Sequence, residues 1–189
     1  MPNPRPEHFV TFAVGGALLA AAAGYVNVVT LLSPAGVTAS HLSGTVTQIA
    51  AELADEHAAQ NPGVALATVV AFVLGAAVTG AALQSTRLAY GRRYGVLLVI
   101  EAGLLGIASW MLGRGSLVGV VPAAMGCGLQ NALATQYSEA VVRTTHVTGI
   151  ATDLGIALGK FVAGRGVDGW RVALYLGLLG GFIFGGAAG

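Results

Sequence analysis

The chain has 189 residues, a formal net charge of +1, 55% hydrophobic residues and only 9% charged residues. Its mean hydropathy of +0.77 is far above the balance of soluble globular proteins. A soluble protein of this composition would expose too much apolar surface, and no basic, aromatic-interleaved patch suggests a nucleic-acid partner. The composition therefore predicts an all-α membrane protein whose surroundings are the lipid bilayer.

Five segments are long enough to cross a hydrocarbon core of ~30 Å as helices. In chain order they cover residues 9–32, 62–83, 94–112, 117–134 and 172–188. We expect the first segment to stay in the mature protein and not to be cleaved as a signal peptide. The residues before it carry only Arg5 as a positive charge, opposed by Glu7, whereas a signal peptide begins with a positively charged region. Two further segments, 36–54 and 144–160, carry polar motifs in apolar surroundings. The sequence thus predicts one membrane domain over 1–189 with five to seven transmembrane segments.

The second half of the chain repeats the first at an offset of about 105 residues. Residues 41–48 reappear at 146–153, and residues 24–27 reappear at 128–131. Downstream, 74–76 and 80–82 are matched by 179–181 and 185–187. We therefore expect two repeats, over about 9–93 and about 115–189. Internal duplication with polar residues at membrane depth is typical of transporters and channels.

The helix at 94–112 has no counterpart after the second repeat. Either the protein is naturally shorter by one helix or the sequence is truncated.

The distribution of basic residues bears on whether the two motif segments cross the membrane. If all seven segments cross, the nine Lys and Arg residues divide four to five between the two faces. If each motif segment instead enters and leaves the membrane on the same face, eight of the nine Lys and Arg residues lie on one face of the membrane. Only Arg114 then lies on the opposite face. The positive-inside rule favours this second arrangement. It predicts a cytoplasmic N-terminus, two inverted halves, and re-entrant or broken motif segments. The sequence Ser-Pro-Ala-Gly at 33–36 also disfavours a continuous helix there. The alternative is two ordinary crossing helices whose polar sides face the bundle.

Polar and ionisable side chains inside the apolar segments are the candidates for a substrate or translocation site. Each costs free energy in lipid unless it is paired or faces water. They are Asn27, His41, Thr45, Thr47, Gln48, Gln130, Asn131, His146, Thr148, Thr152 and Asp153, with Glu101 as an accessory candidate. Because histidine changes charge near neutral pH, His146 and Asp153 are candidates for proton exchange. The alternative role is helix–helix hydrogen bonding worth about 0.6 kcal/mol, which suits the threonines better.

Small residues predict where helices approach closely. Gly177, Gly181 and Gly185 form consecutive Gly-x-x-x-Gly steps, and Gly44 and Gly149 lie inside the two motifs, where a re-entrant turn needs small residues. We expect Gly44 and Gly149 to lie near the bilayer midplane, close to a pseudo-twofold axis. No tight ligand spacing predicts a metal site, and no nucleophile elbow, zincin or P-loop pattern predicts an enzyme or a cofactor.

Residues 24–27, 41–45, 128–132 and 145–155 resemble the motifs of the YoaK-type (DUF1275) family of bacterial multi-pass membrane proteins. The resemblance runs from about residue 12 to the end of the chain. Family members tend to have Asp where Asn27 stands and Asn where Thr45 stands, and they tend to be longer. The resemblance implies a multi-pass protein of the bacterial inner membrane and supplies no substrate.

The expected function is secondary transport or channel-like permeation of a small solute between the two repeats, with proton coupling through histidine and Asp153. The main alternative is a non-transporting accessory subunit of a larger membrane complex. The glycine-rich last helix also allows a homo-oligomer.

Overall fold

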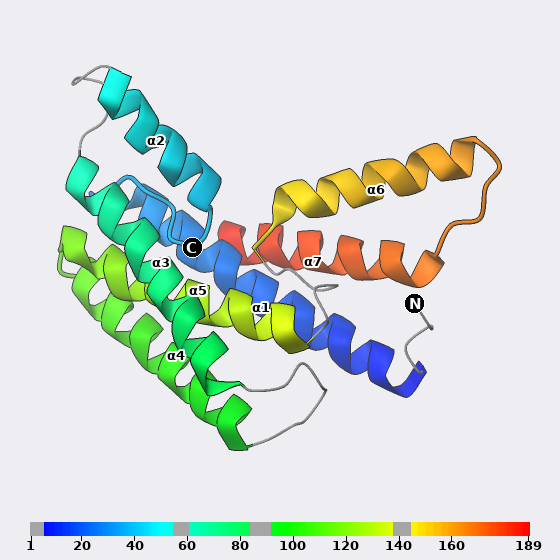
Figure 1. Ribbon diagram of the computed structural model, residues 1–189, viewed down its shortest axis with the longest axis horizontal. Coiled ribbons are helices and arrows are strands. Elements are labelled where there is room, and N and C mark those ends of the chain that lie inside the picture. Colours follow the sequence, from blue (N-terminus) through cyan, green and yellow to red (C-terminus); the bar gives the residue numbers. More distant parts are fainter. Residues whose placement is uncertain (1–5, 55–60, 84–91, 138–144) are drawn as a thin grey trace.

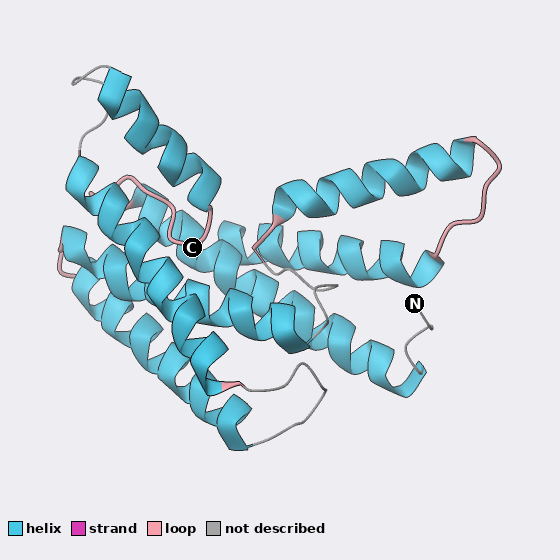
Figure 2. Ribbon diagram, in the orientation of Figure 1, coloured by secondary structure: helices cyan, strands magenta, loops and turns pink. Residues whose placement is uncertain are grey.

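The computed structural model describes residues 6–54, 61–83, 92–137 and 145–189. Within these residues every regular element is a helix (Figures 1 and 2). The elements are α1 (Pro6–Leu32), α2 (Leu42–Ala54), α3 (Pro62–Ala82), α4 (Arg92–Leu112), the 3₁₀ turn η1 (Leu117–Gly119), α5 (Val120–Tyr137), α6 (Val147–Val162) and α7 (Gly169–Ala188).

Five of the helices are long and apolar enough to cross a membrane. The apolar stretches lie in α1, in α3, in α4, in η1 with α5, and in α7, each 20 or 21 residues long. The helices α2 and α6 have 13 and 16 residues, or about 20 and 24 Å at 1.5 Å per residue, which is short of a ~30 Å core. The prediction of an all-α membrane protein with five long apolar segments is confirmed.

Two long helix pairs make up most of the fold. The helix α1 packs along α7, and α3 packs along α5, while α4 covers another side of α5. The core around the second pair consists largely of alanine, including Ala71, Ala123 and Ala124. Small side chains allow helix backbones to approach closely, which is how membrane helices gain packing energy without a hydrophobic driving force.

The helices α1 and α5 run in opposite directions (Figure 1). The Gln130 side chain of α5 donates a hydrogen bond to the Leu19 carbonyl of α1, and nearer the end of α1, Val26 packs in the same cluster as Ala123. Higher residue numbers in α1 therefore meet lower numbers in α5. By contrast α7 runs parallel to α1, because Gly181 lies against Ala17 and Gly185 lies against Ala21.

The chain breaks between α1 and α2 where the sequence predicts a break. Pro34 cannot continue the backbone hydrogen-bond pattern of α1, and Ser33 donates its hydroxyl to the Thr30 carbonyl in the last turn. Gly36 follows with φ of 63°, a left-handed conformation that favours glycine. The chain then runs without helix to His41 before α2 begins at Leu42.

Candidate functional site

Four polar side chains hold the break between α1 and α2 in place: the predicted site residues Asn27, Thr45 and Gln48, and Thr30, which was not predicted from the sequence. The Asn27 side-chain oxygen accepts a hydrogen bond of 2.8 Å from the Ser40 backbone N–H, and both residues are buried. The Thr30 hydroxyl accepts a bond of 3.1 Å from the Ala39 N–H. From the other side of the break, Thr45 donates to the Thr38 carbonyl and Gln48 donates to the Gly36 carbonyl. These side chains satisfy backbone groups that the helix break would otherwise leave unpaired.

The second half has a related contact at the start of α6. The Asn131 side-chain oxygen accepts a hydrogen bond of 3.1 Å from the Thr145 hydroxyl. Thr145 immediately precedes His146, just as Ser40 immediately precedes His41. In both halves, therefore, an asparagine on a long helix holds the residue before the motif histidine.

Each motif histidine lies over the first turn of a short helix. A Cβ atom added to Gly44 would lie 2.8 Å from Cδ2 of the His41 ring. One added to Gly149 would lie 2.8 Å from Cε1 of the His146 ring and still closer to its Nδ1. Both rings are exposed, and each lies at the N-terminus of its helix, where backbone N–H groups give a positive partial charge. The two motif glycines therefore make room for a histidine ring rather than for a neighbouring helix.

The remaining predicted residues divide between exposed and buried positions. Thr47, Thr148, Thr152 and Asp153 are exposed on α2 and α6, and Thr47 and Thr152 donate to carbonyls one turn earlier in their own helices. Gln130 is buried at the contact of α5 with α1. The structure thus arranges most of the predicted residues as two separate units, one at α1–α2 and one at α5–α6.

Four glycines mark two closely similar helix crossings. A Cβ added to Gly24 would meet the Phe182 carbonyl, and one added to Gly185 would meet the Ala21 carbonyl, both at the α1–α7 contact. At the α3–α5 contact, a Cβ on Gly128 would meet the Phe72 carbonyl, and one on Gly75 would meet the Met125 carbonyl. The backbones of each pair therefore touch at glycine.

These crossings correct one part of the sequence alignment between the halves. The sequence match at the 105 offset pairs Gly75 with Gly180, but nothing lies within 4 Å of a Cβ on Gly180. The contacts instead pair Gly75 with Gly185, an offset of 110, and Phe72 with Phe182. In the second half Gly185 lies 36 residues after Gly149, whereas in the first half Gly75 lies 31 residues after Gly44, so the register shifts between the motif and the crossing. Part of the difference lies in the short helix, because α6 has 16 residues and α2 has 13. The repeated Phe-x-x-Gly at 72–75 and 182–185 is the sequence signal for this pairing.

Of the three α7 glycines predicted to lie at helix contacts, two do so and one does not. Gly181 and Gly185 face the α1 backbone, whereas nothing lies within 4 Å of a Cβ on Gly177.

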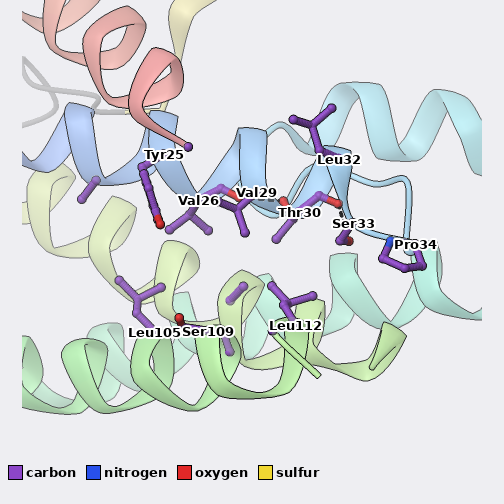
Figure 3. A pocket seen from close by; sticks show the side chains of 15 residues that line it. Tyr25, Val26, Val29, Thr30, Leu32, Ser33, Pro34, Leu105, Ser109 and Leu112 are labelled. Atoms are coloured by element: carbon purple, nitrogen blue, oxygen red, sulfur yellow. Dashed lines mark hydrogen bonds between the residues drawn. The ribbon is translucent and has the colours of Figure 1, made fainter. Parts of the chain in front are cut away.

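A groove of about 560 Å³ lies between the second half of α1, the second half of α4 and the start of α5 (Figure 3). Tyr25 and Thr30 on α1 and Ser109 on α4 bring hydroxyl groups to an otherwise largely apolar lining. None of the predicted site residues lines it. Sequence reasoning missed the groove because its residues come from α1, α4, α5 and the end of the chain after α7, and share no motif.

Glu101 is the remaining predicted residue, and it lies in the interior of the helix bundle. It is 5% exposed on α4, whose other buried residues, Leu97 and Ala108, lie on the same face. Its Oε2 atom is buried without a hydrogen-bond partner. Among the described residues, no three His, Cys, Asp or Glu side chains gather closely enough to hold a metal ion.

Comparison with known proteins places this architecture in one family. The family model described as "Protein of unknown function (DUF1275)" matches residues 15–189. No curated protein and no solved structure matches the chain. The family match covers nearly the whole chain, from within α1 to the end of α7 and including both motif units, in agreement with the resemblance of the motifs. The chain belongs to the DUF1275 family of proteins.

Proposed function

We propose that this protein is a secondary transporter or channel-like permease for a small solute in a bacterial inner membrane. The observation that carries the proposal is the direction of the long helices. With seven full crossings, α1 and α5 would run parallel, whereas they run antiparallel. Each motif segment then leaves and returns on one face, and the two halves are inverted repeats. Inverted repeats with broken helices are the usual plan of secondary transporters.

The polar units suit a site inside such a repeat. Irregular backbone is tolerated at membrane depth only where protein buries it or where it lines a water-filled cavity. Asn27 and Asn131 fix the two breaks, and in our proposal they position the histidines. His41 and His146 are exposed at helix N-termini, so a polar or anionic group of the solute would be favoured beside them. In this proposal Asp153 carries the coupled proton.

The helix pairs supply two bodies that can move against each other. The glycine crossings bind α1 tightly to α7 and α3 tightly to α5, whereas α1 meets α5 over a much smaller contact. Alternating access in repeat transporters is largely a rigid-body movement of one bundle against another. We propose that the α1–α7 pair and the α3–α5 pair are those bodies.

An accessory subunit is the second candidate, because the motif side chains Asn27, Thr45 and Gln48 form hydrogen bonds with the backbone of their own loop. That is the behaviour of structural groups. An accessory subunit would co-purify in stoichiometric amount with a larger membrane protein, whereas a transporter would purify alone or as a homo-oligomer and remain active.

Reconstitution into liposomes tests the proposal. Osmotic swelling is followed with a panel of small neutral and anionic solutes, and a pH-sensitive dye inside the vesicles reports accompanying proton movement. We expect at least one solute to enter faster than in protein-free vesicles. His146→Ala should slow that entry, while Leu158→Ala, on the exposed surface of the same helix, should not. A protein that moves nothing in the panel and is isolated with a fixed partner would overturn the transport proposal.

A further inference from the structure

The groove between α1 and α4 leads toward a buried acid that the motif units do not use. Leu105, Ala108 and Leu112 line the groove, and Glu101 continues the same face of α4 one turn earlier. Four residues of helix correspond to about 6 Å along the axis. Glu101 is also the tenth of the 21 residues of α4, so it lies near the middle of a helix long enough to cross the membrane.

Among the residues that the structure describes, the elements packed against Glu101 offer no charge to balance an ionised carboxylate. The helix α4 packs against α5 and η1. Among the described side chains of those two elements, the titratable group is the thiol of Cys127, which interacts electrostatically with Glu101. The cations of α4 itself, Arg92 and Arg93, lie at its start, and Arg114 lies beyond its end. An isolated buried carboxylate is strongly disfavoured, whereas the protonated acid is neutral and also donates a hydrogen bond.

The groove has the size and the polar groups needed to hold water. Its volume of about 560 Å³ compares with about 30 Å³ for one water in the liquid. Figure 3 shows the Tyr25 and Ser109 side chains on opposite walls, with their hydroxyl ends directed into the space between α1 and α4. A water needs two to four polar partners to be held in such a space. The Tyr25 and Ser109 hydroxyls are two such partners, whereas the Thr30 and Ser33 hydroxyls already bind backbone groups of the α1–α2 break.

We infer that Glu101 is a proton-binding site and that the α1–α4 groove is its water-filled route to one face of the membrane. The carboxylic acid holds a proton in the resting protein. On release, the proton passes to a water in the groove, leaving the carboxylate at Glu101 and a hydrated proton outside. The groove is lined by the C-terminal ends of α1 and α4 and by Gly189 after α7, so the route opens on the face that carries Arg114. The inference concerns the resting protein, so it does not depend on the solute or on transport.

Infrared spectroscopy of the protein in liposomes tests the proton site. A protonated carboxyl has its own carbonyl stretching band, and E101Q removes this group with little change in shape. We expect a band near neutral pH that is lost in E101Q and kept in the matched control D168N, whose carboxylate is exposed on the surface. Cys127 is the only cysteine of the chain, so the S–H band of the same wild-type sample is a second reporter. It should shift together with the carboxyl band as Glu101 loses its proton.

Exchange into D₂O tests the route, because the carbonyl band shifts only when the acid exchanges its proton with solvent. S109F fills the groove, whereas I107F adds the same ring to an exposed position outside the groove lining. We expect exchange to be several-fold slower in S109F and unchanged in I107F. Equal rates in the two variants would overturn the route. The absence of any band dependent on Glu101 between roughly pH 5 and 8, with an unmoved S–H band, would overturn the proton site.

Discussion

Replacing Gly185 by alanine should separate the α1–α7 pair, because there is no space for a single extra methyl group. A Cβ at this position would contact the Ala21 carbonyl and would lie only 2.7 Å from the Ala21 Cα, well inside the 3.4 Å at which ordinary contact begins. The obstacle is backbone, so no side-chain rotation can relieve it. Overpacking of this kind typically costs about 1–3 kcal/mol. The gain in helix propensity from glycine to alanine, about 1 kcal/mol, offsets only part of that cost.

Gly177→Ala is the matched control, since it makes the same chemical change two turns earlier on α7, where nothing lies within 4 Å. We expect Gly185→Ala to lower the free energy of unfolding in mild detergent, measured by denaturant titration of helical circular dichroism. Gly177→Ala should be neutral or stabilising. Gly75→Ala, at the α3–α5 crossing, should resemble Gly185→Ala. Equal stabilities for the Gly185 and Gly177 variants would refute the argument that the α1–α7 backbones touch at glycine.

Three further predictions concern the motif units. Asn27→Leu leaves the buried Ser40 N–H without its acceptor, so unfolding free energy should fall by about 1–3 kcal/mol; an unchanged denaturant midpoint would contradict this. Gly149→Ala should displace the His146 ring, because the added methyl group would overlap it. Nitrogen-15 NMR of the histidine side chains should then show a shifted imidazole signal. An unaltered signal would count against the packing of the His146 ring on Gly149. Asp153→Asn keeps the size and hydrogen bonding of the side chain but removes its charge. The pH-dependent uptake of solute into reconstituted vesicles should therefore be lost while thermal stability is retained. Normal uptake with lost stability would mean that Asp153 has a structural role.

The helices were predictable from sequence where composition alone determines them. The five long apolar stretches lie within a few residues of the helices observed, because hydrocarbon thickness sets their length. The break before α2 was predictable from Pro34 and Gly36, whose backbone restrictions are local. Its stabilisation by Asn27 was not, because the bond joins residues 13 apart across the break.

The candidate site was harder to predict, because side-chain direction and register depend on packing. Periodicity placed Asp153 and His146 on one helix face, but it could not show that both are exposed. The 105 offset gave the wrong glycine partner for Gly75, since the longer α6 and the later crossing point on α7 change the register in a way that only the backbone contacts reveal. Glu101 was recognisable in the sequence as an acid in an apolar helix. Its burial became apparent only from the packing of α4 against α5.

The central claim is that neither motif segment crosses the membrane, so that the two halves are inverted. Single cysteines at Arg92, Arg114 and Arg165, in a chain with Cys127 replaced by alanine, can be labelled with a membrane-impermeant maleimide in intact cells and in inverted vesicles. The account predicts that positions 92 and 165 react from the cytoplasmic face and position 114 from the opposite face. Seven full crossings would instead put positions 114 and 165 on one face with position 92 opposite, and that labelling pattern would contradict the inverted arrangement.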